Sequence, residues 1–364
     1  MRRFLSFRDF DWLLLGFVLL LCALGVLEVY STTFSTRFAG MHVRQIYWIL
    51  GGLVLMFVVS LVDYHSVLER SHWLWIASVV ALAVVLVFGH KALGARRWIA
   101  LPGGIHFQPS EWVKLVVILA LARYFYEMKQ REASLADIAK TGLIAGVPML
   151  LVLVQPDLGT ALTYVPIFLM ALFLGGLRLR HALALGLMAC VLGTGGWLFV
   201  LKDYQKARLT TFLDPETDPQ GKGYQVQQAL IAVGSGGIWG KGLTKGTQTQ
   251  GEFLPMTHTD FAFASFAEEQ GFVGASGVLL LYFIVLARLM NNAQTAPDRA
   301  GTFIVMGVVA VLAFHILVNV GMVVRFMPVT GIPLPLMSYG GSSVLFMFLA
   351  LGMVMNVRMR RFVN

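Results

Sequence analysis

The sequence has little charge and almost no cysteine. Only 13% of its 364 residues are Asp, Glu, Lys or Arg, whereas a soluble domain carries roughly a quarter. Its two cysteines, Cys22 and Cys190, lie in apolar runs and act as small hydrophobic side chains, which excludes a disulfide framework and a thiolate metal site. With 57% hydrophobic residues and a mean hydropathy of +0.75, the chain has more apolar surface than one aqueous core could bury. A soluble globular protein is therefore excluded.

Several sequence motifs of soluble enzymes are also missing. The chain has no H-E-x-x-H, C-x-x-C or G-x-S-x-G pattern, so zinc-hydrolase and serine-hydrolase chemistry have no support. The pattern G-x-x-x-x-G-K-[ST] does not occur either, which excludes a nucleotide-binding P-loop. The net charge of +9 does not indicate nucleic acid, because Lys and Arg that set the topology of a membrane protein explain it.

Long hydrophobic runs dominate what is present. A bilayer-crossing helix needs about 20 mainly apolar residues, and the runs predict an all-α polytopic integral membrane protein with about ten such helices. No long polar linker divides the chain, so residues 1–364 are predicted to form a single transmembrane domain. The predicted spans lie near residues 11–30, 46–62, 74–89, 111–126, 138–154, 158–176, 182–201, 262–287, 301–327 and 340–357.

Lys and Arg in the short loops predict the orientation. An even number of spans puts both termini on one side, and that side would hold most of these basic residues, among them Arg70, Arg178 and Arg358. The termini are therefore predicted to be cytoplasmic. Residues 202–261 then form a long extracytoplasmic loop between the seventh and eighth spans. In this loop, GYQVQQALIAVGSGG predicts a short amphipathic helix in the membrane interface. GSGGIWGKG predicts a turn or a close approach to a ligand.

Basic residues beside the outer ends of spans are candidate functional groups, because charge there is costly. Glu111 and Lys114 are three residues apart at the start of the fourth span and can pair on one helix face. The pair either neutralises itself or directs the lysine at a phosphate. Arg44 and Arg97 either extend to lipid headgroups or join Lys114 in binding a diphosphate.

Acidic residues also gather on the outer side. Asp157 lies in QPDLGTAL, in a tight turn between the fifth and sixth spans. Asp260 precedes the eighth span and either caps that helix or acts as a general base. The second role is favoured by apolar surroundings, which disfavour the charged form and make the carboxylate a better proton acceptor. For Glu268 and Glu269, deeper in the same helix, supporting and structural roles both stay open.

Few titratable groups lie between the two membrane surfaces. Asp63 is at the cytoplasmic side and His315 lies within the ninth span, with little between them, which disfavours a proton-driven transporter. His315 and Asn319 are one turn apart and predict a hydrogen bond between helices.

Ordered motifs along the chain carry a family resemblance. NVGMVVRFMPVTGIPLPLMSYGGSS (Asn319 to Ser343) resembles the C-terminal motif of the SEDS family, the shape, elongation, division and sporulation proteins. GARRWI, FQPSEWVKL, QPDLGTAL, KGYQVQQALIAVGSGGIWGKG and LPMTHTDFAFASFAEEQG are similar to further motifs of this family in the expected order, so the resemblance covers essentially the whole chain. GTQTQGEFLP and the short termini are more similar to the elongation type than to the division type. The chain departs from the family at Met256-Thr257, where Glu with a variable residue is expected, and at Phe326, where an aliphatic residue is usual.

The resemblance implies a peptidoglycan glycosyltransferase that polymerises lipid II into β-1,4-linked glycan strands with inversion. It implies that Asp260 is the general base. Substrate-binding roles are implied for Arg44, Arg97, Lys114, Glu111, Asp157 and Gln225, with Arg96, Glu268, Glu269 and Ser338 as secondary candidates. No metal ligand is identified, and participation of a divalent cation such as Mg²⁺ or Mn²⁺ is left open.

The resemblance also implies partners and leaves alternatives. The partners are lipid II, the nascent glycan on undecaprenyl diphosphate, a class B penicillin-binding protein, other elongation-complex proteins and membrane lipids, but no nucleic acid. A division-type polymerase, a lipid II flippase and a scaffold for a transpeptidase are the alternatives. A flippase would not need Asp260 as a base and would need a polar lining that continues to the cytoplasm, of which the sequence shows little. A scaffold would need neither a substrate cavity at the outer ends of the spans nor the charged residues there.

Overall fold

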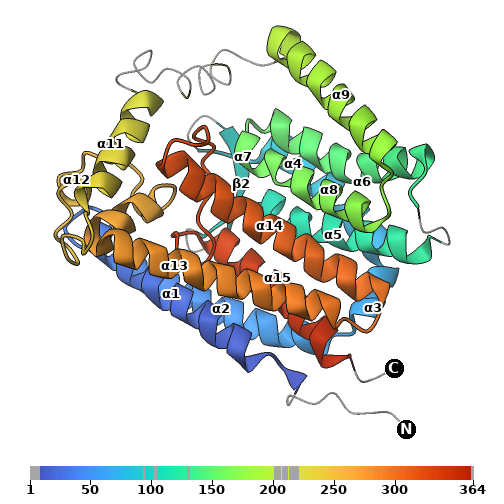
Figure 1. Cartoon of the computed structure of the whole chain (residues 1–364), viewed down its shortest axis with the longest axis horizontal. Helices are drawn as coiled ribbons and strands as arrows, with labels where there is room; N and C mark the ends of the chain where they lie inside the picture. The colour runs from blue at the N-terminus through green and yellow to red at the C-terminus, as the bar shows by residue number, and fades with distance from the viewer. Residues whose placement is uncertain are drawn as a thin grey trace.

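The chain folds into a bundle of long helices with one small sheet (Figure 1). This computed structural model describes residues 9–92, 95–101, 105–128, 132–200, 206, 212 and 221–361. The elements are α1 (Trp12–Thr33), α2 (Met41–Leu61), α3 (Tyr64–Glu69), α4 (Ser71–Phe88), β1 (His90–Ala92), β2 (Ala95–Leu101), β3 (Ile105–Phe107), α5 (Pro109–Glu127), α6 (Leu135–Val154), α7 (Leu158–Leu162), α8 (Tyr164–Leu174), α9 (Leu179–Gly195), a π-helix (Gly196–Val200), α11 (Lys222–Ser235), α12 (Thr247–Gln250), α13 (Ala262–Gln294), α14 (Arg299–Val323) and α15 (Gly341–Met359).

Among the described residues, eight helices are long and apolar enough to cross a membrane. They are α1, α2, α4, α6, α9 with its π-helical continuation, α13, α14 and α15, and each coincides with a predicted span. The other two predicted spans fall on α5 and on the α7–α8 segment. That segment is interrupted at Thr163, where Pro166 has no amide hydrogen to continue the helical ladder. The all-α membrane architecture is confirmed, while the number of ten spans stays a prediction.

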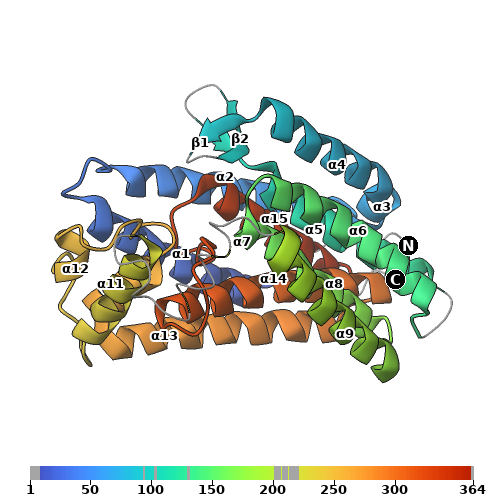
Figure 2. The ribbon, with the colours of Figure 1, turned by 90° about the horizontal axis from the view of Figure 1, so that it is seen from above.

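The loop between the third and fourth predicted spans contains a small sheet that the sequence analysis missed. β1, β2 and β3 pair in that order, and both pairs are antiparallel. The sheet lies at the end of α4 (Figure 2). It places Arg96 and Arg97 on β2, so these two arginines extend from a strand rather than from a loop.

Helix α13 is broken near its N-terminal end, and the glycine-rich segment after α11 fills the break. Gly271 has φ 66° and ψ −167°, a conformation that only glycine adopts readily. A Cβ on Gly271 would lie 2.2 Å from the backbone nitrogen of Gly240. Four backbone hydrogen bonds join the segment to the break: Phe272 N to Gly237 O (2.8 Å), Val273 N to Ile238 O (3.1 Å), Lys241 N to Glu268 O (3.1 Å) and Gly242 N to Glu269 O (2.9 Å). The glycine-rich segment GSGGIWGKG, for which the sequence predicts a turn or a close approach to a ligand, thus lies directly against the backbone of α13.

Both ends of the described chain lie at one end of the bundle. Arg358 of α15 pairs with Asp11, which caps α1, at 3.0 Å, and Arg288 of α13 contacts the same carboxylate at 3.2 Å. Helices α11 and α12 lie at the opposite end (Figure 1). Most of residues 202–220, the first part of the predicted long loop, lie outside the described residues. Helix α11 falls where the amphipathic helix is predicted, and its place in the membrane interface stays a prediction.

Helices α14 and α15 form the centre of the bundle. Of the most apolar window of each, 72% is buried, against 44% or less for the other candidate spans. Helix α14 packs against α5, α8, α13 and α15. Because α14 is enclosed by other helices, its polar residues His315 and Asn319 face protein rather than lipid, and both are buried.

Candidate active site

Asp260 lies in the turn before α13, and no side chain caps that helix. The N-cap is Phe261, one residue after Asp260, so the interpretation of Asp260 as a helix cap is wrong. The Asp260 side chain is partly buried. Its Oδ2 lies 3.4 Å from the position that a Cβ on Gly331 would occupy. The carboxylate therefore faces the loop that follows α14.

Three consecutive carbonyl oxygens hold the backbone at Asp260. The backbone N of Tyr339 donates to the carbonyl of His258 (2.8 Å). The hydroxyl of Ser338 donates to the carbonyl of Thr259 (2.6 Å). The carboxamide of Asn319 donates to the carbonyl of Asp260 itself (2.9 Å). Since the three donors come from α14 and from the loop before α15, those elements fix the direction of the segment that carries Asp260.

The same loop joins Asp260 to the turn at Asp157. A Cβ on Gly159, in the first turn of α7, would lie 2.7 Å from the carbonyl oxygen of Thr330. Thr330 precedes Gly331, which faces Asp260. The Thr330–Gly331 backbone therefore lies between α7 and the Asp260 carboxylate. Asp157 and Asp260, which are far apart in sequence, thus line one region.

Arg97 and Asp157, which both have implied substrate-binding roles, meet in this region. Arg97 donates through Nε to the carbonyl of Gln155 (3.2 Å) and through a terminal nitrogen to the carbonyl of Pro156, and its other terminal nitrogen lies 3.7 Å from Oδ1 of Asp157. Gln108 donates to Oδ2 of Asp157 at 3.0 Å. The arginine is thus held in place by the turn, and 28% of its side chain stays exposed.

The predicted pair of Glu111 and Lys114 forms, and it is buried. Lys114 Nζ lies 3.0 Å from Oε2 of Glu111, and the lysine side chain is fully enclosed. Its ammonium also lies 3.3 Å from Nε2 of His315 and 4.4 Å from the centre of the Phe346 ring. The expected partner of His315 on another helix is therefore Lys114 of α5. In this arrangement the ammonium is surrounded by protein side chains and does not face an open cavity.

Arg44 is exposed in the first turns of α2, beside a buried anchor. Gln45 donates to the carbonyl of Ser338 at 3.1 Å and accepts from the amide of Gly340 at 3.4 Å. These bonds tie α2 to the loop that holds Asp260. Within the part of the chain that the structure describes, Arg44 has no ion pair. Gln225 is half-buried on α11, and no contact in the structure brings it to Asp260.

The remaining candidates have structural partners. Arg96 donates to the carbonyl of Val87 at the end of α4 (3.0 Å). Glu268 accepts from the amides of Gln248 (2.9 Å) and Thr249 (3.1 Å) and pairs with Lys241 (2.7 Å). Glu269 contacts the hydroxyl of Ser31 at 2.5 and 2.6 Å. These side chains fix the strand, α11–α12 and α1 around the site. The contacts of Glu268 and Glu269 with other protein groups favour a structural role for both.

His258, two residues before Asp260, packs between aromatic rings. It is buried, and its ring packs 5.0 Å from that of Phe38 and 6.1 Å from that of Tyr339. Burial lowers the pKa of His258 below the usual value of 6.5, because the charged imidazolium loses its hydration. The packing of His258 beside Asp260 therefore favours the uncharged form of this ring.

Sequence reasoning did not single out Gln45 or Gln108, and it predicted for Asn319 only a hydrogen bond between helices. Gln45, Gln108 and Asn319 all hold backbone or carboxylate groups of the predicted site residues. Gln108 and Asn319 lie within the motifs quoted above, but the pattern gives no sign that their partners lie dozens of residues away. Among the described residues, no group of three or more His, Cys, Asp or Glu could hold a metal ion.

Comparison with known proteins gives consistent similarities along the whole chain. The profile of the cell cycle protein family of FtsW, RodA and SpoVE matches residues 11–362. The peptidoglycan glycosyltransferase RodA of Treponema pallidum is 34% identical, over 97% of this chain and 98% of the relative. The peptidoglycan glycosyltransferase MrdB of Escherichia coli K12 is 39% identical, over 96% of this chain and 94% of the relative.

Solved structures show the same architecture. A chain from a peptidoglycan synthase complex, described as coordinating polymerisation and crosslinking, has a TM-score of 0.84 at 34% identity and covers 98% of this chain and 99% of its own. The rod shape determining protein RodA of Thermus thermophilus has a TM-score of 0.72 at 32% identity, covering 97% and 98%. The fold is thus that of solved relatives over nearly its full length.

Proposed function

The chain belongs to the cell cycle protein family of FtsW, RodA and SpoVE, and we propose that it is a RodA-type peptidoglycan glycosyltransferase that polymerises lipid II into β-1,4 glycan strands. One observation carries the choice of site. The Thr330–Gly331 backbone lies between the Asp260 carboxylate and the first turn of α7, where Arg97 is held beside Asp157. An inverting transfer from a diphosphate needs a carboxylate as the base and positive charge for the leaving group. This region holds both a carboxylate and a fixed guanidinium.

Asp260 is the general base in this proposal. The donor is the growing chain, joined through C1 of its terminal MurNAc to undecaprenyl diphosphate. The acceptor is the 4-hydroxyl of GlcNAc in a second lipid II. Asp260 accepts the hydroxyl proton as the oxygen attacks C1, the C1–diphosphate bond breaks, and the diphosphate leaves with its electron pair. Because an α-linked donor gives a β-linked product, one displacement suffices and no sugar–enzyme bond forms.

The leaving diphosphate needs positive charge rather than a proton. Charge-assisted hydrogen bonds from guanidinium groups are short and strong. Arg44, whose side chain is exposed, is proposed to make them. Arg97 adds a held guanidinium beside Asp157. Lys114 is enclosed, so it contributes positive potential from within the protein and orients Glu111. Gln225 of α11 is proposed to bind the substrate on the ground of the family resemblance alone. A divalent cation bound with the substrate diphosphate is compatible with this chemistry.

The orientation follows from where the substrate is. Lipid II is polymerised outside the cytoplasm, so Asp260 belongs at the outer face of the inner membrane and both termini belong in the cytoplasm. Residues 1–364 then act as one transmembrane domain, with residues 202–261 forming part of the active site. A class B penicillin-binding protein is the proposed partner, supported by the similarity to a chain from a complex that coordinates polymerisation and crosslinking. Other elongation-complex proteins are proposed on the same ground.

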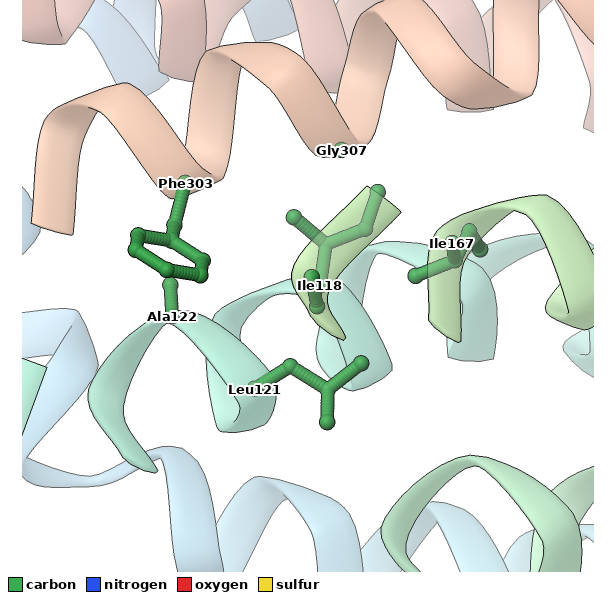
Figure 3. A pocket seen from close by; sticks show the side chains of 7 residues that line it. Ile118, Leu121, Ala122, Ile167, Phe303 and Gly307 are labelled. Carbon is green, nitrogen blue, oxygen red and sulfur yellow. The ribbon is translucent and has the colours of Figure 1, made fainter. Parts of the chain in front are cut away.

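The packing inside the bundle disfavours a flippase. A lipid II headgroup would need a polar route past Lys114 towards the cytoplasmic end. One turn beyond Lys114, α5 instead packs on α8 and α14 around a pocket of about 10 Å³, room for about one water molecule. Figure 3 shows this pocket and its apolar lining, which comprises Ile118, Leu121, Ala122, Ile167, Ala171, Phe303 and Gly307.

The test is glycan polymerisation from purified lipid II in detergent, with the cognate transpeptidase partner present. Wild type is compared with Asp260→Ala and Asp260→Asn, and the expected loss is at least about 10²–10⁴-fold, the contribution of a general base. Glu252→Gln is the matched control, because Glu252 is an exposed acid in the same loop, and it should polymerise normally.

Each outcome has a clear meaning. Polymer from wild type and the control, but not from well-folded Asp260 variants, supports a polymerase that depends on this carboxylate. Polymer from both Asp260 variants would keep the enzyme and remove Asp260 as its base. No polymer from an intact wild-type complex, with Mg²⁺ or Mn²⁺ added, would contradict the proposed activity and favour a flippase.

A further inference from the structure

Asn319 is a fully buried asparagine whose single amide group joins two loops. Its Nδ2 donates to the carbonyl of Asp260 (2.9 Å) and to the carbonyl of Ile332 (2.8 Å). A carboxamide nitrogen has two hydrogens, so both are used. One hydrogen reaches the segment before α13, and the other reaches the loop after α14. The distance between these two backbones is thus set by one side chain.

The second loop is the one that the Asp260 carboxylate faces. Gly331, next to Ile332, lies against Oδ2 of Asp260. When Asn319 holds the carbonyls of Asp260 and Ile332 together, the carboxylate has a fixed distance to the loop wall. Without the amide, the partly buried carbonyl of Asp260 and the buried carbonyl of Ile332 would face each other with no donor between them, and their repulsion would separate the loops.

Helix α14 also links this position to Lys114. His315 lies one turn before Asn319 on α14, and its Nε2 contacts the Lys114 ammonium at 3.3 Å. Because both residues extend from one rigid, buried helix, the spacing between the Glu111–Lys114 pair and the Asp260 backbone is fixed by the helix itself.

We propose that Asn319 is a positioning residue for the glycosyl transfer, holding the Asp260 carboxylate in line with the acceptor hydroxyl by clamping the Asp260 and Ile332 carbonyls. The inference rests on the proposed function, in which Asp260 is the base. Asn319 does not touch the reacting atoms and acts through the backbone. A misplacement of about 1 Å at a reacting group can cost about 10²-fold in rate, so a clamp of this kind has a measurable effect.

The chain provides a matched control at the opposite end of the bundle. Asn356 of α15 is also fully buried, and its Nδ2 also donates to two carbonyls, those of Val59 (2.8 Å) and Val62. It additionally accepts a hydrogen bond from the amide of Tyr64 (3.3 Å). Replacing Asn356 should therefore destabilise the protein at least as much as replacing Asn319, without moving the site.

The experiment measures kcat and KM for lipid II, together with the thermal midpoint, for the complex with the partner transpeptidase. Asn319→Leu is isosteric and has no donor. We expect its kcat to fall about 10–100-fold while KM stays within about threefold, because the lost interaction acts in the transition state. Asn356→Leu should lower the thermal midpoint by as much or more and keep kcat within about threefold.

Several results would overturn the inference while leaving the enzyme intact. They are a wild-type kcat in Asn319→Leu, a loss of kcat no larger than in Asn356→Leu, or a rise in KM with kcat unchanged. Asn319→Asp, isosteric and with at most one donor, is tested by the same criteria and carries the test if the leucine variant does not fold. Inactive wild type would instead contradict the proposed function, so the two failures are distinguishable.

Discussion

Gly331 lies directly against the carboxylate of Asp260, with the position of a Cβ at residue 331 only 3.4 Å from Oδ2. Gly331 also has φ 76°, in the left-handed region. A glycine here therefore meets two requirements, the backbone conformation of the loop and the close approach of an acidic side chain. The shape of the loop after α14 is matched to the group that it faces.

Gly331→Ala should weaken catalysis more than it weakens the fold. An alanine in the left-handed region costs roughly 1–2 kcal/mol, and the loop can relieve that strain only by moving at Asp260. We expect kcat for lipid II to fall about tenfold, with a small drop in thermal midpoint. Gly340→Ala is the control, because its extended φ of 166° suits any residue and its nearest atom would be 3.7 Å away. Equal losses in both variants would contradict the prediction.

Gly271→Ala should disrupt the broken part of α13. The added Cβ would lie 2.2 Å from the backbone nitrogen of Gly240, and both atoms belong to backbones that cannot rotate away. We expect loss of the folded protein or a fall in thermal midpoint far larger than that of Gly277→Ala. Gly277 is in the same helix with open space at its Cβ, and alanine there gains up to about 1 kcal/mol of helix propensity. Fluorescence-detected thermal unfolding in detergent would measure both, and similar midpoints would show that the break tolerates a side chain.

His258 should make stability depend on pH in the weakly acidic range. Its folded-state pKa is lowered by burial, so the unfolded chain binds the proton more readily than the folded one. Stability is then fully present above the unfolded value of about 6.5, and it is lost as pH falls below it. The thermal midpoint should decline from pH 7 to pH 5, and His258→Phe should flatten that decline. The exposed His90 provides the control, and an unchanged pH profile in His258→Phe would refute the role of His258.

Local sequence patterns predicted those features that depend on neighbours along the chain. Apolar runs place α1, α2, α4, α6, α13, α14 and α15, because a single helix must be apolar along its own length to lie in a bilayer. The spacing of three residues predicted the Glu111–Lys114 pair, because residues that far apart share a helix face. The turn at Asp157 was also predicted, because this residue lies between two apolar runs, and it separates α6 from α7.

Features that depend on residues distant in the chain could not be predicted from the sequence pattern. The break in α13 lies within a predicted span and is stabilised by residues 237–242, which the pattern of α13 alone does not contain. The sheet at β1–β3 is built from strands of three to seven residues, too short for a period of two to stand out. The clamp by Asn319 joins carbonyls at residues 260 and 332, and the sequence of α14 marks the asparagine but not its partners.

Glu111 and Lys114 allow a structural role to be separated from a role in catalysis. Both side chains are almost fully buried, so removal of one leaves an uncompensated charge, which costs about 3–5 kcal/mol. Lys114→Met and Glu111→Leu should each lower the thermal midpoint strongly. The double variant replaces the pair by apolar side chains of similar size, and such replacements are often neutral for stability. We expect the double variant to recover most of the lost stability.

The activity of that double variant decides the role of the lysine. With methionine at position 114 the protein is stable but contributes no positive potential near the departing diphosphate, and His315 loses the ammonium that it contacts at 3.3 Å. We therefore expect kcat to stay at least about tenfold below wild type, since a single group that stabilises transition-state charge is worth about 10²–10³. Thermal midpoints and polymerisation rates of all four proteins complete the double-mutant cycle. If activity returned together with stability, the pair would serve only to hold α5 in the bundle, and Arg44 and Arg97 would be left as the groups that bind the diphosphate.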